Sequence, residues 1–367
     1  MTRRAVVVGG GIGGLAAAIG LRGTGWDVTV YEQADGLTEV GAGIALWQNG
    51  LRALDDLGVG DAVRAVAGPG FGGAIRDVTG RVIANVDPPR VVERYGGLGV
   101  VLHRADLIDL LAKSYGDVSV GSRVTSVLPG DRRATVVSPG DPVVADLVVG
   151  ADGLNSVVRA VLHGSTPPRY TGVTAWRALV DFPADQLLPG ETWGDGETFG
   201  RVAVARDRAY VFGAARAPQG ARAPDEKAEM LRRFGSWHVP LPDIVASIES
   251  DAILRNDIFD RPVLRQWSRG CVTLLGDSAH PMAPALGQGA CQALEDAAAL
   301  ARIVTPDRDV VDALSEYEAA RSRRANRFVR QSRLLTDVMF RSRTLRDFGA
   351  RRVLPLVQPR AFAQMLG

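Results

Sequence analysis

The chain is poor in the residue types that build metal centres and disulfide frameworks. Its 367 residues include two cysteines and four histidines: Cys271, Cys291, His103, His163, His238 and His280. No His-x-x-x-His pair occurs, and the two cysteines do not have the spacing of a zinc motif. We therefore expect neither a metal site nor a disulfide-stabilised scaffold.

Long apolar runs and an excess of charge of one sign are missing as well. No stretch approaches the roughly 18 apolar residues that a membrane-spanning helix needs. The first apolar run is short and interrupted by glycine, unlike a signal peptide. The net charge of +2 gives no overall attraction to nucleic acid or to membranes. We expect a cytoplasmic monomer or homodimer that binds no nucleic acid and has no firm membrane association.

The composition that is present is typical of a globular protein. Hydrophobic residues make up 46% of the chain and charged residues 23%, which is ordinary for a folded protein with its own core. A length of 367 residues exceeds one typical domain. Two domains are therefore the starting expectation.

Residues 4–32 have the pattern of a strand–helix–strand unit. Ala5–Val8 is a continuous apolar run, as expected for a parallel strand buried on both faces. Leu15–Leu21 is rich in small helix-forming residues, and Asp27–Tyr31 reads as the second strand. The sequence Gly-Gly-Gly-Ile-Gly-Gly, residues 9–14, connects the first strand to the helix.

This connection contains a GxGxxG pattern in the context that binds dinucleotides. Gly9 permits a tight turn, Gly11 lets a pyrophosphate approach the backbone, and Gly14 permits close helix–strand packing. The helix N-terminus that follows favours phosphate. Glu32 lies about twenty residues further on, where an acid binds a free ribose 2′-hydroxyl and so favours FAD or NAD over NADP. A tight turn without a ligand is the alternative interpretation.

A second GxGxxG match at residues 68–73 has a different context. It follows an expected helix, contains Pro69 and leads into an expected hairpin over 71–86 with a Thr79-Gly80 turn. No helix N-terminus follows that could bind phosphate. We therefore interpret this match as a loop.

Two further strand–turn–helix segments occur later in the chain. Asp146–Leu162 reads as a buried strand, a turn at Asp152-Gly153 and a helix started by Asn155 that carries Ser156 and Arg159. Leu274–Ala301 reads as a strand that ends at Gly276-Asp277, a turn rich in Gly and Pro, and a helix from about Ala290. Cofactor-type turns at both ends of the chain indicate one extended ligand held at both of its ends.

The rest of the sequence predicts further helices and strands, and its composition changes after about residue 166. We expect helices over 49–66, 104–113 and 224–234 and beyond Asp309, and strands near 117–128, 133–149 and 272–275. From about 166 to 260, short β-like runs are separated by Gly, Pro and aromatic residues. This segment predicts a β-rich domain inserted into the nucleotide fold.

In this order and spacing, the three motifs resemble those of the FAD-dependent aromatic monooxygenases, the class A flavoprotein hydroxylases with the p-hydroxybenzoate hydroxylase fold. Three more stretches match, at 41–59, 103–112 and 171–180. The resemblance implies an α/β fold: a Rossmann-type FAD-binding domain with a parallel sheet, an inserted β-rich substrate domain and C-terminal helices. The implied division is 1–70, 99–165 and 261–330 for FAD binding, 71–98 and 166–260 for substrate, and 331–367 as a helical segment.

The resemblance also implies roles for individual residues. The ADP half of FAD is assigned to Gly9, Gly11, Ile12, Gly13, Gly14 and Glu32. Contacts to the ribitol, the phosphates and the flavin ring are assigned to Gly43, Ile44, Arg104, Gly276, Asp277, Pro284, Gly287, Gly289 and Ala290. Asp152, Gly153 and Arg159 form a second fingerprint associated with FAD and with the nicotinamide donor. The helix that starts near Ala290 points its N-terminus at the N1–C2=O edge of the flavin, where negative charge collects on reduction.

Several residues are open to more than one interpretation. Gln33, Gln48 and Cys291 depart from the family pattern; Cys291 is either a reactive thiol or, as we prefer, a small residue packed near the ring. His280 is either a general base or part of the scaffold. Cys271 is expected to be an inert buried thiol.

The substrate wall is expected on the inserted domain. The aromatic candidates are Trp176, Phe182, Trp193, Phe199, Tyr210 and Phe212, of which Trp176 and Tyr210 are preferred. Strand alternation implies that about half of them face the core. Arg177 and Arg201 are candidates to bind a phenolate or carboxylate, with exposed strand arginines as the alternative, and Pro284 completes the pocket set.

The implied activity is hydroxylation of an aromatic or heteroaromatic small molecule. The reaction consumes O2, with NADH or NADPH as a transient electron donor. It proceeds through a flavin C4a-hydroperoxide in a site that excludes water. Three alternatives stay open: an FAD-dependent reductase, dehydrogenase or halogenase; a non-catalytic FAD-binding protein; and a plain NAD-binding protein. The WxWxIP signature of the halogenases is missing.

Overall fold

The computed structural model describes most of the chain. The described residues are 2–37, 42–68, 70, 72–85, 93, 97–130, 132–205 and 208–341. Parts of the predicted hairpin and of the predicted 71–98 segment, and residues 342–367 of the predicted 331–367 segment, lie outside these residues. Among the described residues, no helix is both long enough and apolar enough to cross a membrane.

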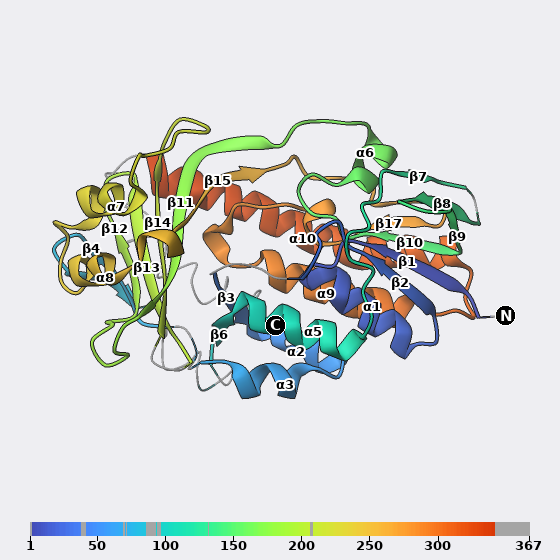
Figure 1. The fold of residues 1–367 in the computed structure, drawn as a ribbon, viewed down its shortest axis with the longest axis horizontal. Coiled ribbons are helices and arrows are strands. Elements are labelled where there is room, and N and C mark those ends of the chain that lie inside the picture. Colours follow the sequence, from blue (N-terminus) through green and yellow to red (C-terminus); the bar gives the residue numbers. More distant parts are fainter. Residues whose placement is uncertain are drawn as a thin grey trace.

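A five-stranded sheet forms the centre of the larger part of the molecule (Figure 1). Its strand order is β16-β17-β10-β1-β2. The strands are β1 (Arg4–Val8), β2 (Asp27–Tyr31), β10 (Leu147–Gly150), β16 (Ser268–Arg269) and β17 (Val272–Leu274). β2, β1, β10 and β17 run parallel, while β16 is antiparallel to β17. All four residues of β10 and all three of β17 are buried, as the continuous apolar runs predicted.

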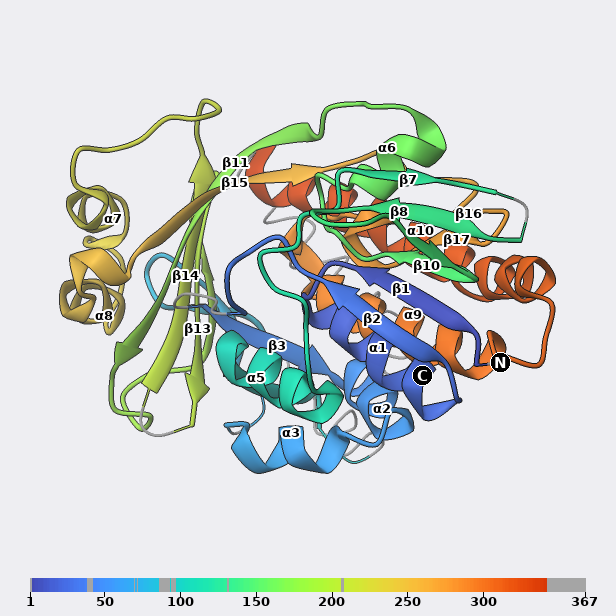
Figure 2. The same ribbon diagram turned by 45° about the vertical axis from the view of Figure 1, so that its right-hand side comes forward.

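Helices and a small sheet cover the two faces of this sheet. Figure 2 shows α1 (Ile12–Gly23) and α9 (Gly289–Ile303) on one face. A three-stranded meander covers the other face, formed by β7 (Ser126–Leu128), β8 (Ala134–Val137) and β9 (Val143–Ala145). One hydrophobic core joins them, with Leu15 and Leu21 of α1 and Leu294 and Leu300 of α9 fully buried.

A two-stranded sheet and three helices extend this part toward the second sheet. β3 (Gly43–Trp47) pairs antiparallel with β6 (Gly99–His103). The helices are α2 (Gln48–Asp56), α3 (Gly60–Val66) and α5 (Arg104–Tyr115), and α6 (Val157–His163) follows β10. Residues 57–59 divide the predicted helical segment 49–66 into α2 and α3.

The second sheet has seven strands in the order β15-β11-β14-β13-β12-β4-β5. The strands are β4 (Ala74–Asp77), β5 (Val82–Asn85), β11 (Arg169–Asp181), β12 (Gly190–Trp193), β13 (Glu197–Val204), β14 (Arg208–Arg216) and β15 (Leu254–Asp260). α7 (Glu226–Phe234) and α8 (Leu241–Ser247) cover what we call the outer face, the side away from the five-stranded sheet (Figures 1 and 2). The opposite side is the inner face.

The long helix α10 (Val310–Arg341) spans both parts of the molecule. Tyr317 packs in the core of the larger part, and its hydroxyl donates to the Leu274 carbonyl. Met339 and Phe340 pack with Ile75 and Trp193 of the seven-stranded sheet. The helix is continuous across the predicted boundary at residue 330.

Local predictions differ from the structure at a few positions. Within 117–125 the described backbone makes only an isolated bridge from Ser119 to Tyr31, and the regular strand starts at Ser126. α8 was not predicted. Helix α6 is capped by Ser156, whose side chain accepts from the Arg159 N–H, and not by Asn155. In the second GxGxxG match, Gly68 pairs with Val101 and Gly73 leads into β4, as the loop interpretation predicted.

Candidate active site

The first glycine motif forms an open cradle at the end of β1. Gly9 has φ +108°, and a Cβ there would lie 2.4 Å from the Ala151 carbonyl oxygen; a Cβ on Gly14 would lie 1.9 Å from the Gly9 carbonyl oxygen. Nothing lies within 4 Å of the position a Cβ on Gly11 would take. Gly11 is the N-cap of α1 and provides no side-chain cap, so the first N–H groups of this helix face space that a phosphate can enter.

Glu32 is positioned beside this cradle. Its carboxylate accepts the Gly10 N–H at 2.7 Å through Oε2 and the Ala34 N–H at 2.8 Å through Oε1. These bonds orient the carboxylate and leave acceptor capacity on both oxygens. A ribose hydroxyl can use that capacity.

Parallel pairing brings the three motifs together, because the carboxyl ends of parallel strands lie at one edge of a sheet. β10, which precedes Asp152, lies between β1 and β17. The Gly9–Gly14 turn, the Asp152-Gly153 turn and the Gly276-Asp277 turn therefore lie side by side. No sequence spacing specifies this strand order.

The Asp152 and Arg159 side chains hold the third turn in place. Asp152 accepts the N–H groups of Val157 and Val158 and the hydroxyl of Ser278. Arg159 donates to the carbonyls of Ser278 and Ala279 at 3.0 and 3.1 Å. Burial, together with the nearby Arg261, lowers the pKa of Arg159 to about 10. The second fingerprint thus supports the backbone at Asp277.

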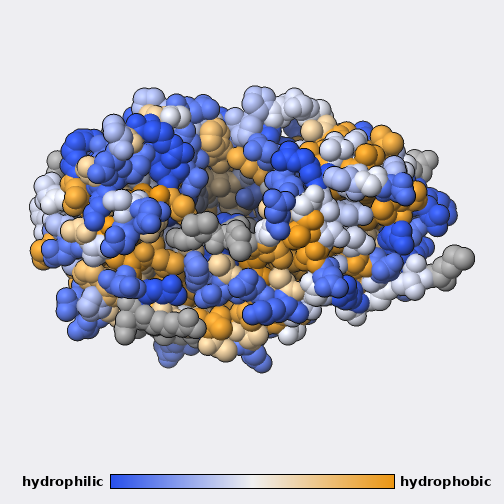
Figure 3. All heavy atoms as spheres, viewed as in Figure 1, coloured by the Kyte–Doolittle hydropathy of each residue, from blue (hydrophilic) through white to orange (hydrophobic). Residues whose placement is uncertain are grey.

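Asp277 itself is an exposed residue of the Gly276–Ser278 turn that follows β17. Its side chain is accessible to solvent although protein surrounds it on most sides. That crowding raises the pKa of its carboxyl, while His280 and Arg104 act in the opposite direction. Figure 3 shows the hollow between the part with the seven-stranded sheet and the rest of the molecule.

His280 belongs to the scaffold and not to the cleft. Its side chain is fully buried, and its ring Nε2 lies 2.6 Å from Asp296 Oδ2. Asp296 also accepts the Gly276 N–H at 3.1 Å and Arg321 Nε at 2.7 Å. The general-base alternative for His280 is therefore wrong, because substrate in the cleft has no access to it.

A buried polar network fixes the turn before α9. Asn49 donates to Gln288 at 3.0 Å and to Glu295 at 2.5 Å, and Gln292 donates to both. Glu295 also pairs with Arg321 and Arg324. The sequence analysis missed this network; its one signal was the Glu295-Asp296 pair inside an otherwise apolar helix.

The turn of Pro284–Leu286 and the start of α9 face the cleft. Pro284 and Gly287 are exposed, while Gln288 is buried in the network. Gln288 is the N-cap of α9 but gives it no side-chain hydrogen bond. The side chain of the N-cap therefore does not satisfy the first N–H groups of this 15-residue helix.

Cys291 and Cys271 are both buried and are not joined in a disulfide. Cys291 Sγ accepts the Trp47 N–H at 3.3 Å and packs against Gly50. Burial raises the pKa of Cys291 to about 12. Cys291 is packed as a small buried residue of the helix, as preferred above, while its place near the flavin ring stays a prediction. Cys271 is fully buried, as expected for an inert thiol.

The inner face of the seven-stranded sheet forms the opposite wall of the cleft. Along β14, residues on the outer face are buried, whereas Tyr210 and Phe212 on the inner face are partly exposed. Tyr210 lies against Gly43 of β3. Burial raises the pKa of the Tyr210 hydroxyl, while Arg177 and Arg104 oppose that shift. Tyr210 and Arg177 thus lie on the cleft side.

Two other pocket candidates lie on the wrong side of the sheet. Trp176 is 1% exposed and packs against Phe234 of α7. Arg201 is fully buried and donates to Thr192 and to the Leu187 carbonyl. Both project from the outer face, as do Phe182 and Phe199. The expectation that Trp176 and Arg201 line the substrate pocket is therefore corrected by the strand register.

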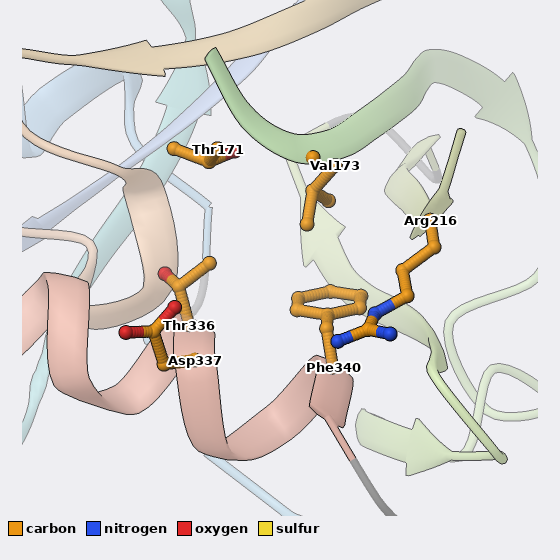
Figure 4. A pocket seen from close by; sticks show the side chains of 7 residues that line it. Thr171, Val173, Arg216, Thr336, Asp337 and Phe340 are labelled. Carbon is orange, nitrogen blue, oxygen red and sulfur yellow. The ribbon is translucent and has the colours of Figure 1, made fainter. Parts of the chain in front are cut away.

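A separate cavity of about 220 Å³ opens between the start of β11 and the end of α10 (Figure 4). Its walls include Val173 and Phe340, with Arg216 on one side. None of the residues predicted to bind FAD lines this cavity. It is not the candidate active site.

These features define a class of protein: a nucleotide-binding α/β domain whose cleft is closed by an inserted β-sheet. The chain belongs to the family described as FAD binding domain, whose model matches residues 2–332. It is an FAD-dependent oxidoreductase of the flavoprotein monooxygenase type. The open cradle of the first motif fits this cofactor.

Particular relatives are similar over nearly the whole chain. The sequence is 40% identical to aurachin C monooxygenase/isomerase of Stigmatella aurantiaca over 330 residues, covering 88% of this chain and 86% of that protein. It is 34% identical to FAD-dependent urate hydroxylase of Klebsiella pneumoniae over 346 residues, covering 91% and 90%. A crystal structure of Klebsiella pneumoniae HpxO with FAD and uric acid matches with a TM-score of 0.91 at 30% identity, covering 99% of this chain and 97% of that one.

Proposed function

We propose that this protein is an NAD(P)H- and O2-dependent monooxygenase that hydroxylates a small aromatic or heteroaromatic molecule. The observation that supports this most is the composition of the cleft. One wall is the exposed Pro284–Gly287 turn with the N-terminus of α9, and the other is the inner face with Tyr210 and Phe212. A flat ring fits between a flavin on the first wall and aromatic side chains on the second.

The residues of the three turns have the chemistry to hold FAD along the edge of the sheet. We assign the ADP half to the Gly9–Gly14 cradle, including Ile12 and Gly13, and its ribose to Glu32. Asp277 and Arg104 are assigned to the ribitol and phosphate region, with Gly43, Ile44 and Gly276 beside them. Asp152, Gly153 and Arg159 act by holding the Asp277 turn.

When bound, FAD takes electrons from NAD(P)H and delivers one oxygen atom of O2 to the substrate ring. The chain contributes the open N-terminus of α9 next to Pro284, Gly287, Gly289 and Ala290. A helix N-terminus stabilises negative charge by about 0.3–1 kcal/mol, and by more in a partly buried site. The inner face contributes apolar surface that keeps water from the reacting ring.

The substrate itself can provide the ionised group that the reaction needs. His280 is fully buried and out of reach of a ligand in the cleft, and burial raises the pKa of Tyr210, which keeps its hydroxyl protonated near neutral pH. Arg177 lies beside Tyr210 and can stabilise a phenolate already present on the substrate. We therefore favour substrates whose own hydroxyl or ring N–H ionises or donates.

The test measures NADH and NADPH oxidation by the FAD-loaded protein in the presence of uric acid, 6-hydroxynicotinate or salicylate, compounds that the names of relatives and structural neighbours suggest. We expect at least one of these, or a related ring, to stimulate oxidation and to gain one ¹⁸O atom from ¹⁸O2. A reduced or dehydrogenated product without ¹⁸O contradicts the proposal and supports a reductase or dehydrogenase. A protein that binds FAD but consumes no NAD(P)H with any compound supports a non-catalytic role.

We also propose the division of the chain predicted above, with 71–98 and 166–260 acting on substrate. In support, β4 and β5 join β11–β15 in one sheet. Residues 331–341 are better grouped with the rest of α10, because the helix runs unbroken from Val310 to Arg341.

A further inference from the structure

Glu191 is a carboxylic acid in an unusual position on the inner face. It lies in the middle of β12, between β13 and β4, so it is not at an edge of the sheet. Its register partners are Gly200 on β13 and Ile75 on β4. Strand alternation puts Glu191 and Trp193 on the same face, and Trp193 packs with Ile75 and Ala283. Glu191 therefore faces the same side as Tyr210 and the turn that precedes Pro284.

The surroundings of this carboxyl are apolar and aromatic. Gly200, directly opposite, has no side chain, and the ring of Phe212 occupies the space there: a Cβ on Gly200 would lie 2.0 Å from Phe212 Cζ. Phe212 in turn lies 5.7 Å from the ring of Tyr210, centroid to centroid. A continuous row of Trp193, Glu191, Phe212 and Tyr210 thus crosses the inner face.

One oxygen of the carboxyl is held and the other is available. Trp193 Nε1 donates to Glu191 Oε2 at 2.8 Å. Within the described part of the chain, Oε1 has no hydrogen-bond partner and no Arg or Lys pairs with Glu191. The side chain remains partly accessible to solvent. Arg201, whose charge opposes the rise in the pKa of Glu191, projects from the outer face.

Burying the Glu191 carboxyl in these surroundings destabilises the folded protein, so a functional role is the more economical explanation. A carboxylate crowded by apolar groups and lacking a cationic partner loses solvation without compensation, and burial does raise the pKa of Glu191. Pairing with a single indole N–H does not need a carboxyl at this position, because a backbone carbonyl or an amide serves equally well. An accessible, oriented acceptor next to aromatic rings suits a ligand.

We propose that Glu191 is a specificity-determining residue of the substrate site, whose Oε1 accepts a hydrogen bond from an N–H or O–H on a flat aromatic ring. Trp193 holds the carboxyl in position, and Phe212 and Tyr210 provide the surface on which the ring lies. The substrate class is thereby narrowed to aromatic or heteroaromatic rings with a donor on the edge that points away from the flavin. This inference rests on the proposed function, since it places the substrate between the inner face and the Pro284 turn.

The test compares two ligands that differ in one donor. 2-Quinolone presents a ring N–H, and 1-methyl-2-quinolone is the same ring without it. Dissociation constants are measured on the FAD-loaded protein from the change in the flavin absorption spectrum, without NAD(P)H, so no turnover is involved. We expect the wild-type protein to bind 2-quinolone about tenfold or more tightly, the value of one hydrogen bond to a charged acceptor.

The informative variant is Glu191→Gln. The amide keeps an oxygen for Trp193 but presents an NH₂ group to the ligand, so we expect the preference for 2-quinolone to fall to about one. If Glu191 had only a structural role, the substitution would weaken the binding of both ligands equally. The ratio of the two dissociation constants would then stay at its wild-type value. Trp193→Phe, which keeps the carboxyl but frees it, should reduce the preference partially.

The matched control is Glu197→Gln, the same change on the adjacent strand. Glu197 projects from the outer face and pairs with Arg233, so the preference should stay at its wild-type value. An unchanged ratio in Glu191→Gln, or no binding of 2-quinolone to FAD-loaded wild-type protein, overturns the inference. Neither result decides the proposed function, because that function is tested separately by the transfer of ¹⁸O from ¹⁸O2 to the product. The ¹⁸O test fails only if no oxygen is transferred.

Discussion

Tyr210 of the inserted sheet lies over the position where Gly43 has no side chain. A Cβ on Gly43 would come within 2.3 Å of Tyr210 Cγ. Gly43 begins β3 of the FAD-binding part, so this contact joins the two walls of the cleft at one point. We expect the spacing between the two walls to depend on it.

Gly43→Ala should therefore push the two walls apart. We expect a loss of about 1–3 kcal/mol in the free energy of unfolding, the usual cost of overpacking, and weaker substrate binding. Urea denaturation and ligand titration measure the two effects. The control is Gly23→Ala in α1, where nothing lies within 4 Å of the new Cβ; a loss of similar size there would contradict the explanation.

Asp277→Ala should weaken FAD retention. The carboxyl lies on the turn that Asp152, Arg159 and His280 support. Loss of one charge-assisted hydrogen bond predicts an affinity about tenfold or more lower, measured by flavin fluorescence during dilution or dialysis. Asp61→Ala, at a fully exposed side chain, should retain FAD normally. Equal affinities in both variants would show that Asp277 does not contact FAD.

Asp296→Ala should destabilise the fold rather than change only catalysis. It removes the shared acceptor for Gly276, His280 and Arg321, and leaves the guanidinium of Arg321 with fewer partners in a buried site. Breaking a buried pair from one side costs about 3–5 kcal/mol, which urea denaturation detects. The comparison is Glu316→Ala, which removes an exposed pair with Arg308 and should cost about 1 kcal/mol or less.

The stability of the protein should fall on mild acidification, in part through His238. Thr192 Oγ1 lies 2.9 Å from His238 Nε2 and also accepts from Arg201, while His238 Nδ1 lies 2.6 Å from the Val239 carbonyl oxygen. Burial lowers the pKa of His238 below its ordinary value of 6.5. The charges of Arg201 and Arg76 lower this pKa further, while the hydrogen bond to the Val239 carbonyl opposes the shift. Below about pH 6.5 the unfolded chain therefore binds more protons than the folded protein. The contribution of neutral His238 to the free energy of unfolding is complete above about pH 6.5 and is lost as the pH falls below that value.

The measurement is the thermal midpoint from pH 7.5 to 5.5 for the wild-type protein and for His238→Gln. We expect a shallower decline in the variant. His163 also has a pKa lowered by burial, so part of the slope should remain. An identical slope in both proteins would mean that His238 does not contribute.

Much of the FAD end could be predicted because its signals are local in the sequence. Gly9–Gly14 combines a turn, an open helix N-terminus and close packing within six residues, and each follows from the absence of a side chain. The strand, the turn and the capped helix around Asp152 are similarly local. The family follows from these motifs, and the comparisons confirm it.

The substrate end could not be predicted in the same way, because it depends on which face of a sheet each residue occupies and on what covers that face. Trp176 and Tyr210 are equally plausible by composition, yet α7 and α8 bury the first and leave the second open to the cleft. Glu191 had no motif at all and is defined only by its register with Gly200 and its bond from Trp193.

The sequence by itself determined the fold class, the cofactor and the enzyme family, since short glycine and acid patterns specify turns whose geometry is local. The tertiary structure alone decided which aromatic and charged side chains line the cleft, because strand register and the packing of α7, α8 and α10 join residues more than a hundred positions apart. It also decided that His280 supports the Asp277 turn: its partner Asp296 lies on a helix one face of which is buried in the core.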